Sequence, residues 1–126
     1  LMKEKRDGLI INVSSWSGNH VSLLSGVSYT SSKHALNAMT ETINMKYCNL
    51  GIRATALCPG EVATAILDKR PKKLSKEQKN KMLQPDDLGQ TIVFLCQMPK
   101  HVCINELTIS PTWHRRYIAD LGIEEL

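Results

Sequence analysis

A serine, a tyrosine and a lysine stand close together near the start of this 126-residue chain. Tyr29 and Lys33 are four residues apart, which places their side chains on one face if the run from Ser28 is helical. A neighbouring ammonium, which Lys33 can supply, favours the phenolate of a tyrosine and lowers its pKa from a usual value of about 10. Tyr29 can then exchange a proton while the hydroxyl of Ser15 hydrogen-bonds a substrate oxygen on which charge develops. These residue types predict acid–base catalysis at an oxygen atom.

Each of these residues also has an ordinary structural explanation when it is taken alone. A serine at the end of a strand often caps the chain, a tyrosine on a helix is often half-buried, and a lysine is usually solvated. A tyrosine four residues before a lysine can also arise by chance, so the surrounding elements decide how the pair is interpreted.

An apolar run precedes the three residues and a helical pattern follows them. Residues 9–13 are apolar and β-branched, with one asparagine, which predicts a parallel strand covered on both faces. Ser15 follows the carboxyl end of this strand, where ligands bind in open α/β sheets. The helix that follows should end near Gly51. It carries an apolar stripe that we expect to pack in the core, made of Leu36, Met39, Ile43, Tyr47 and Leu50.

The rest of the chain predicts two more strands and one more long helix. Residues 52–58 should form a parallel strand that breaks at Pro59, and residues 102–109 the last strand. A helix should begin at Pro85, where the missing amide donor is harmless, and end before the next proline. Residues 65–84 have no strong period, and we expect weak order there. This alternation predicts an α/β fold with a parallel sheet and helices on both faces.

Three short motifs occur in order along the chain: NVSSWSG, YTSSK and PGEVAT. Their order and separations resemble those of the short-chain dehydrogenase/reductase family, and the resemblance covers nearly the whole chain. It implies that residues 1–126 are a single domain, the C-terminal catalytic half of a doubly wound Rossmann-like sheet. The family's glycine-rich phosphate-binding turn has no counterpart in the sequence. We therefore expect the N-terminal nucleotide-binding half to be absent, and this chain alone to be inactive.

The resemblance also implies a function for each motif. Tyr29 would exchange a proton with the substrate, Lys33 would hydrogen-bond the nicotinamide ribose, and Ser15 would hold the substrate oxygen. The cofactor, either NAD or NADP, would lie against Tyr29 and Lys33 and against Pro59, Gly60, Val62 and Thr64. The implied reaction is hydride transfer that interconverts an alcohol and a carbonyl of a small molecule. The implied assembly is a homo-oligomer, either a dimer or a tetramer.

Composition is ordinary for a globular chain, with 42% hydrophobic residues. Much of the net charge of +4 comes from residues 69–81, which hold seven basic residues and one acid. We expect a solvated face there. We expect no nucleic acid as a partner, because aromatic residues are sparse among the basic ones, and no membrane, because no apolar run is long enough to span a bilayer. The alternative is a non-catalytic or degenerate relative that serves in assembly, or that binds an anionic partner through this cluster with Trp113, Arg115 and Arg116.

The cysteines and histidines show none of the spacings typical of a metal site, so we predict no metal. The cysteines should be free thiols in a reducing compartment: Cys48, Cys58, Cys96 and Cys103. The expected location is therefore cytoplasmic.

Overall fold

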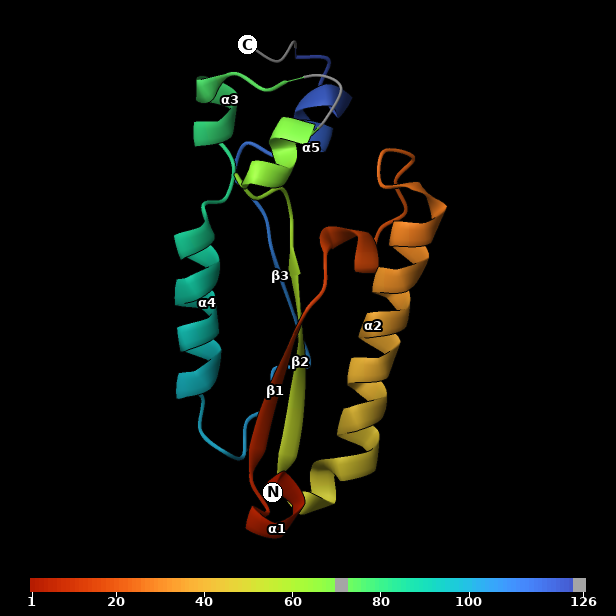
Figure 1. The fold of residues 1–126 in the computed structure, drawn as a ribbon, viewed down its shortest axis with the longest axis vertical. Helices are drawn as coiled ribbons and strands as arrows, with labels where there is room; N and C mark the ends of the chain where they lie inside the picture. Colours follow the sequence, from red (N-terminus) through yellow and green to blue (C-terminus); the bar gives the residue numbers. More distant parts are fainter. Residues whose placement is uncertain (70–72, 124–126) are drawn as a thin grey trace.

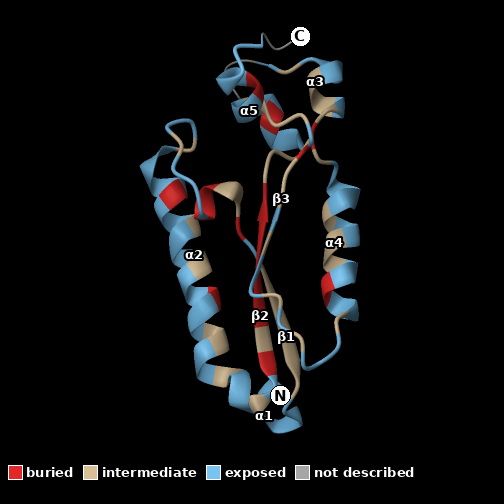
Figure 2. Ribbon diagram, turned by 180° about the vertical axis from the view of Figure 1, so that it is seen from behind, coloured by how far each residue is buried: buried red, intermediate tan, exposed pale blue. Residues whose placement is uncertain are grey.

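The computed structural model describes residues 1–69 and 73–123 of the chain. Its sheet is parallel, with the strands in the order β1 (Gly8–Val13), β2 (Ile52–Pro59) and β3 (Glu106–Ile109). The two long helices, α2 (Gly26–Tyr47) and α4 (Pro85–Gln97), lie on opposite sides of this sheet (Figures 1 and 2). The predicted α/β fold with a parallel sheet is confirmed.

Short helices connect these elements. They are α1 (Met2–Lys5), η1 (Trp16–Gly18), η2 (Cys48–Leu50), η3 (Ala65–Lys69), α3 (Lys76–Asn80) and α5 (Arg115–Asp120). Two of them, η3 and α3, fall in the segment where weak order was predicted. Helix α3 begins with a capping box, in which Ser75 and Gln78 exchange side-chain and backbone hydrogen bonds. Residues 70–72 of the basic segment lie outside the described residues.

Strand β2 forms the centre of the core. Ala54, Leu57 and Cys58 are completely inaccessible to solvent, since β2 has a strand on each side and a helix over each face. Figure 2 shows the buried residues concentrated along this strand. On the α4 side, Leu95 is also buried. None of the helices in the described residues is both long enough and apolar enough to cross a membrane.

The last strand is shorter than predicted, and the prediction that it begins at residue 102 is wrong. Val102 lies in a turn, where its amide donates to the carbonyl of Pro99 (2.9 Å). Pairing with β2 starts only when Asn105 accepts a hydrogen bond from the amide of Ala56 (3.0 Å). Earlier in β2, the backbone of Ala54 forms its hydrogen bonds on this side with a side chain and not with β3. The Asn44 amide donates to its carbonyl (2.8 Å) and accepts from its N–H (2.6 Å).

The expected apolar stripe of α2 is also wrong as a description of the core. None of its five residues is buried, and Met39 is 49% exposed. The buried residues of α2 are Thr30 and Thr40. The Thr40 hydroxyl accepts a hydrogen bond from the side chain of Asn12 in β1 (2.9 Å). The face of α2 that meets the sheet therefore carries polar groups, which bind strand side chains and strand backbone, whereas most of its apolar side chains lie nearer to solvent.

Candidate active site

The spacing of Tyr29 and Lys33 brings them together on α2, as predicted. The Lys33 ammonium lies 5.6 Å from the centre of the Tyr29 ring and donates a hydrogen bond to the carbonyl of Val13 (3.1 Å). Val13 is the last residue of β1, so Lys33 joins the helix to the carboxyl end of that strand. The Tyr29 side chain is 47% exposed and is free to meet a bound molecule.

Ser15 lies just beyond β1, at the edge of the sheet where parallel strands end. It is the N-cap of η1, and its hydroxyl oxygen accepts a hydrogen bond from the amide of Ser17 (3.1 Å). The hydroxyl proton of Ser15 stays available for a substrate oxygen. Ser17 in turn shares a hydrogen bond with Ser25 (2.7 Å between hydroxyl oxygens), just before α2 begins. The loop after Ser15 is thereby attached to the helix that carries Tyr29.

The third motif continues from the end of β2 at the same edge of the sheet. Gly60 donates its amide to the carbonyl of Ile109 (2.7 Å), and a side chain at this glycine would press on Ser110 and Pro111. Val62 forms a parallel bridge with Leu83 of the segment after α3. Pro59 is buried, whereas Thr64 is exposed. Gly60 thus packs closely against Ser110 and Pro111, and Thr64 presents an open hydroxyl.

An aromatic cluster that the sequence motifs did not predict joins the Ser15 loop to α5. Trp16 stacks on His20 (4.3 Å between ring centres) and lies 4.6 Å from His114. His114 stacks on Tyr117 (4.2 Å). Burial lowers the pKa of His114, and its Nδ1 is buried without a hydrogen-bond partner within the described part of the chain. The only sequence signal was the mixture of aromatic and basic residues in the C-terminal tail.

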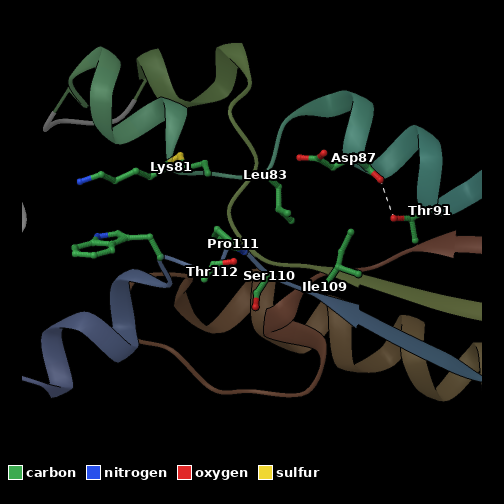
Figure 3. A pocket seen from close by; sticks show the side chains of 10 residues that line it. Lys81, Leu83, Asp87, Thr91, Ile109, Ser110, Pro111 and Thr112 are labelled. Atoms are coloured by element: carbon green, nitrogen blue, oxygen red, sulfur yellow. Dashed lines mark hydrogen bonds between the residues drawn. The ribbon is translucent and has the colours of Figure 1, made fainter.

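A cavity of about 660 Å³ opens on the other side of the sheet, between the start of α4 and the end of β3 (Figure 3). Lys81, Asp87, Ile109 and Trp113 are among its lining residues, and the Lys81 ammonium lies 4.6 Å from the centre of the Trp113 ring. Ser15, Tyr29 and Lys33 do not line it.

The basic residues proposed to bind an anionic partner are partly paired within the chain. Lys79 binds Asp68 (2.6 Å), and Lys81 lies 3.5 Å from Glu77 in addition to its contact with Trp113. Arg115 also forms an ion pair, with Glu61 (2.9 Å). Within the described residues these contacts reduce the charge that the cluster presents to a partner, and the anion-binding alternative remains a prediction.

Comparison with known proteins identifies the family. The family model for short chain dehydrogenases matches residues 1–75, which include all three motifs. The human dehydrogenase/reductase SDR family member 11 is 34% identical over 121 residues, which cover 88% of this chain and 46% of that protein. The chain belongs to the short-chain dehydrogenase family.

Solved structures of similar proteins share the fold. A β-ketoacyl-[ACP] reductase from Bacteroides thetaiotaomicron is 34% identical, with a TM-score of 0.70 over 93% of this chain and 45% of that one. An alcohol dehydrogenase from the archaeon Thermococcus sibiricus, solved in complex with 5-hydroxy-NADP, is 26% identical, with a TM-score of 0.71 over 89% of this chain and 45% of that one. The chain thus spans about half the length of the relatives it matches, and its sheet fits part of their Rossmann fold.

Proposed function

We propose that this chain carries the proton-transferring residues of an NAD(P)-dependent oxidoreductase that interconverts an alcohol and a carbonyl. One observation carries the proposal: Lys33 is anchored to the end of β1 with its ammonium 5.6 Å from the Tyr29 ring, and Ser15 follows the same strand end. Membership of the short-chain dehydrogenase family supports it. The specific site roles of these residues are part of the proposal.

Ser15, Tyr29 and Lys33 each have a separate role at one substrate oxygen. In the reducing direction, the Tyr29 hydroxyl donates its proton to the carbonyl oxygen, and in the oxidising direction its phenolate accepts the proton of the alcohol. Ser15 donates a hydrogen bond to the same oxygen as negative charge develops there. The Lys33 ammonium brings a positive charge to within 5.6 Å of the centre of the Tyr29 ring.

The residues of the third motif fit the nicotinamide end of a cofactor. The exposed Thr64 offers a hydroxyl to an amide group, and Gly60 lets the chain leave β2 in close contact with Ser110 and Pro111. When bound, the nicotinamide would supply or accept the hydride. The choice between NAD and NADP is left open. We propose the activity for the protein in which this chain is joined to a nucleotide-binding segment, since the chain spans about half of its relatives.

The experiment is a steady-state assay of the full-length protein that contains this chain, with NADH and NADPH and a panel of small carbonyl compounds. Tyr29→Phe should lower kcat by roughly 100-fold or more, the usual contribution of a positioned acid–base group. Tyr47→Phe is the matched control, because Tyr47 lies at the opposite end of α2, beneath Lys3. A Tyr29→Phe variant that keeps the wild-type rate, or a Tyr47→Phe variant that loses as much, would contradict the proposal.

We further propose that the intact protein is a homo-oligomer in contact through α2. This helix leaves Met39 and Met45 49% and 77% exposed, which is apolar surface available to another subunit. Light scattering of the full-length protein, with Met45→Lys as the disrupting variant, tests this point. A monomeric wild-type protein would contradict it.

A further inference from the structure

We infer that Asn37 and Asn19 are positioning residues that set Ser15 relative to Tyr29; this inference rests on the proposed function. Asn37 follows Lys33 by one turn of α2, as Lys33 follows Tyr29. The three side chains therefore follow one another along the same face of the helix. In the proposed function Tyr29 meets the substrate, whereas Lys33 binds the backbone before Ser15 and Asn37 binds a side chain of the loop after it.

A chain of hydrogen bonds runs from α2 through the Ser15 loop to the last strand. The Asn37 amide nitrogen donates to the side-chain oxygen of Asn19 (2.8 Å). The Asn19 amide nitrogen donates in turn to a carboxylate oxygen of Glu106, the first residue of β3 (2.6 Å). A hydrogen bond to a carboxylate is among the stronger kinds in proteins. Asn19 is thereby fixed from two elements that are far apart in the sequence.

The side chain of Asn37 also contacts the buried thiol of Cys58. Its amide nitrogen lies 3.6 Å from the sulfur of Cys58, and the same sulfur lies 3.8 Å from its carbonyl oxygen. Cys58 is completely buried in β2, so it cannot move away without disturbing the core. Cys58 therefore contacts both polar atoms of the Asn37 amide, and the hydrogen bond to Asn19 sets which of them faces the loop.

Gly18 of the loop lies in close contact with the side chain of Asn37. A side-chain carbon at Gly18 would lie 2.7 Å from the Asn37 amide nitrogen and 2.8 Å from the Ser14 hydroxyl. A side chain at this position would therefore force Asn37, Ser14 or the loop itself to move.

Ser15 lies between two attachments that both start from α2. On one side Lys33 holds the carbonyl of Val13, and on the other Asn37 holds the side chain of Asn19. Because the same helix carries Tyr29, these two attachments fix where the Ser15 hydroxyl lies relative to the Tyr29 hydroxyl. A displacement of about 1 Å at a reacting group can cost on the order of 100-fold in rate. Asn37 thus acts on the reaction through Ser15 and need not touch the substrate.

The test is a double-mutant cycle in the full-length protein, measured as kcat with saturating cofactor. Asn37→Ala should lower kcat by about 10- to 100-fold and leave the KM for the cofactor unchanged. In a Ser15→Ala background the same substitution should have little further effect, because the residue through which Asn37 acts is gone. Asn49→Ala is the matched control, since Asn49 is exposed in η2, just beyond the C-terminal end of α2, and should keep the wild-type rate.

A second readout follows the loop itself. The amides of Gly18 and Asn19 donate hydrogen bonds inside the loop, so hydrogen exchange in a peptide covering residues 15–20 should accelerate in Asn37→Ala and stay unchanged in Asn49→Ala. Should Asn37→Ala fail to fold, Glu106 offers a milder pair of variants at the exposed end of the network. Glu106→Gln keeps an acceptor oxygen for Asn19 and should keep most of the rate, whereas Glu106→Ala should lose it.

The possible outcomes separate this inference from the proposed function. A wild-type protein that reduces no carbonyl with either cofactor removes both. The inference alone is overturned if the wild-type protein is active and Ser15→Ala slows it, but Asn37→Ala reduces kcat by the same factor with and without Ser15. Equal rates for Glu106→Gln and Glu106→Ala would also overturn it.

Discussion

Replacing Gly18 by alanine tests how closely the Ser15 loop lies on α2. The new methyl group would lie 2.7 Å from the Asn37 amide nitrogen, 0.7 Å short of the 3.4 Å at which ordinary contact begins. It would also lie 2.8 Å from the Ser14 hydroxyl. Overpacking of this kind costs about 1–3 kcal/mol, and alanine recovers part of it by restricting the unfolded chain. We expect a net loss of about 1–2 kcal/mol in the free energy of unfolding.

Thermal unfolding of the full-length protein, followed by circular dichroism, measures this loss. For a chain of about twice the present length, about 1–2 kcal/mol corresponds to a fall in Tm of roughly 2–8 °C. Gly89→Ala is the matched control. Gly89 lies inside α4 with no atom near its missing side chain, so alanine should stabilise the helix by about 0.5–1 kcal/mol. A Gly18→Ala protein that unfolds at or above the wild-type temperature, beside a Gly89→Ala protein that behaves as expected, would refute the close contact.

Two further predictions concern buried titratable groups. Burial lowers the pKa of His114 below its usual 6.5; the charge of Glu61 raises this pKa and that of Arg116 lowers it. The unfolded state therefore takes up a proton more readily than the folded state. The contribution of His114 to stability should therefore be complete above pH 6.5 and lost as the pH falls through the lowered pKa. The Tm should accordingly drop more steeply between pH 7.5 and pH 5 in the wild type than in His114→Phe. Equal slopes in the two proteins would contradict this. Burial also raises the pKa of the Cys58 thiol, so an aromatic disulfide reagent should label the exposed Cys48, Cys96 and Cys103 of the folded protein first and Cys58 only on unfolding; rapid labelling of Cys58 in the native state would count against its burial.

The local features of the site could be predicted from the sequence because they depend on short spacings. Tyr29 and Lys33 come together since a helical turn joins residues four apart. Ser15 lies at the edge of the sheet since it follows a short apolar strand. The boundaries of α4 followed from Pro85 and from the proline beyond its end.

The features that were missed depend on contacts between distant parts of the chain. The stripe on α2 looked like core by its spacing, but Asn44 and Thr40 face the sheet because polar groups of the strands need partners there. No periodicity shows that Asn44 completes the hydrogen bonding of Ala54 where β3 has not yet begun. The aromatic cluster was also beyond reach, because its members, including Trp16 and Tyr117, come from opposite ends of the sequence.

The hydrogen bond between Asn19 and Glu106 has a consequence for how the protein is made. The two residues are 87 positions apart, so the loop after Ser15 is synthesised long before its carboxylate partner exists. At ribosomal rates of about 5–20 residues per second, this interval is roughly 4–17 s. Contacts that close so long a stretch of chain form late in folding, because the entropy of loop closure must be overcome first. The nascent chain therefore carries Ser15, Tyr29 and Lys33 in an unfinished arrangement, and the loop reaches its final geometry only when the last strand has been added.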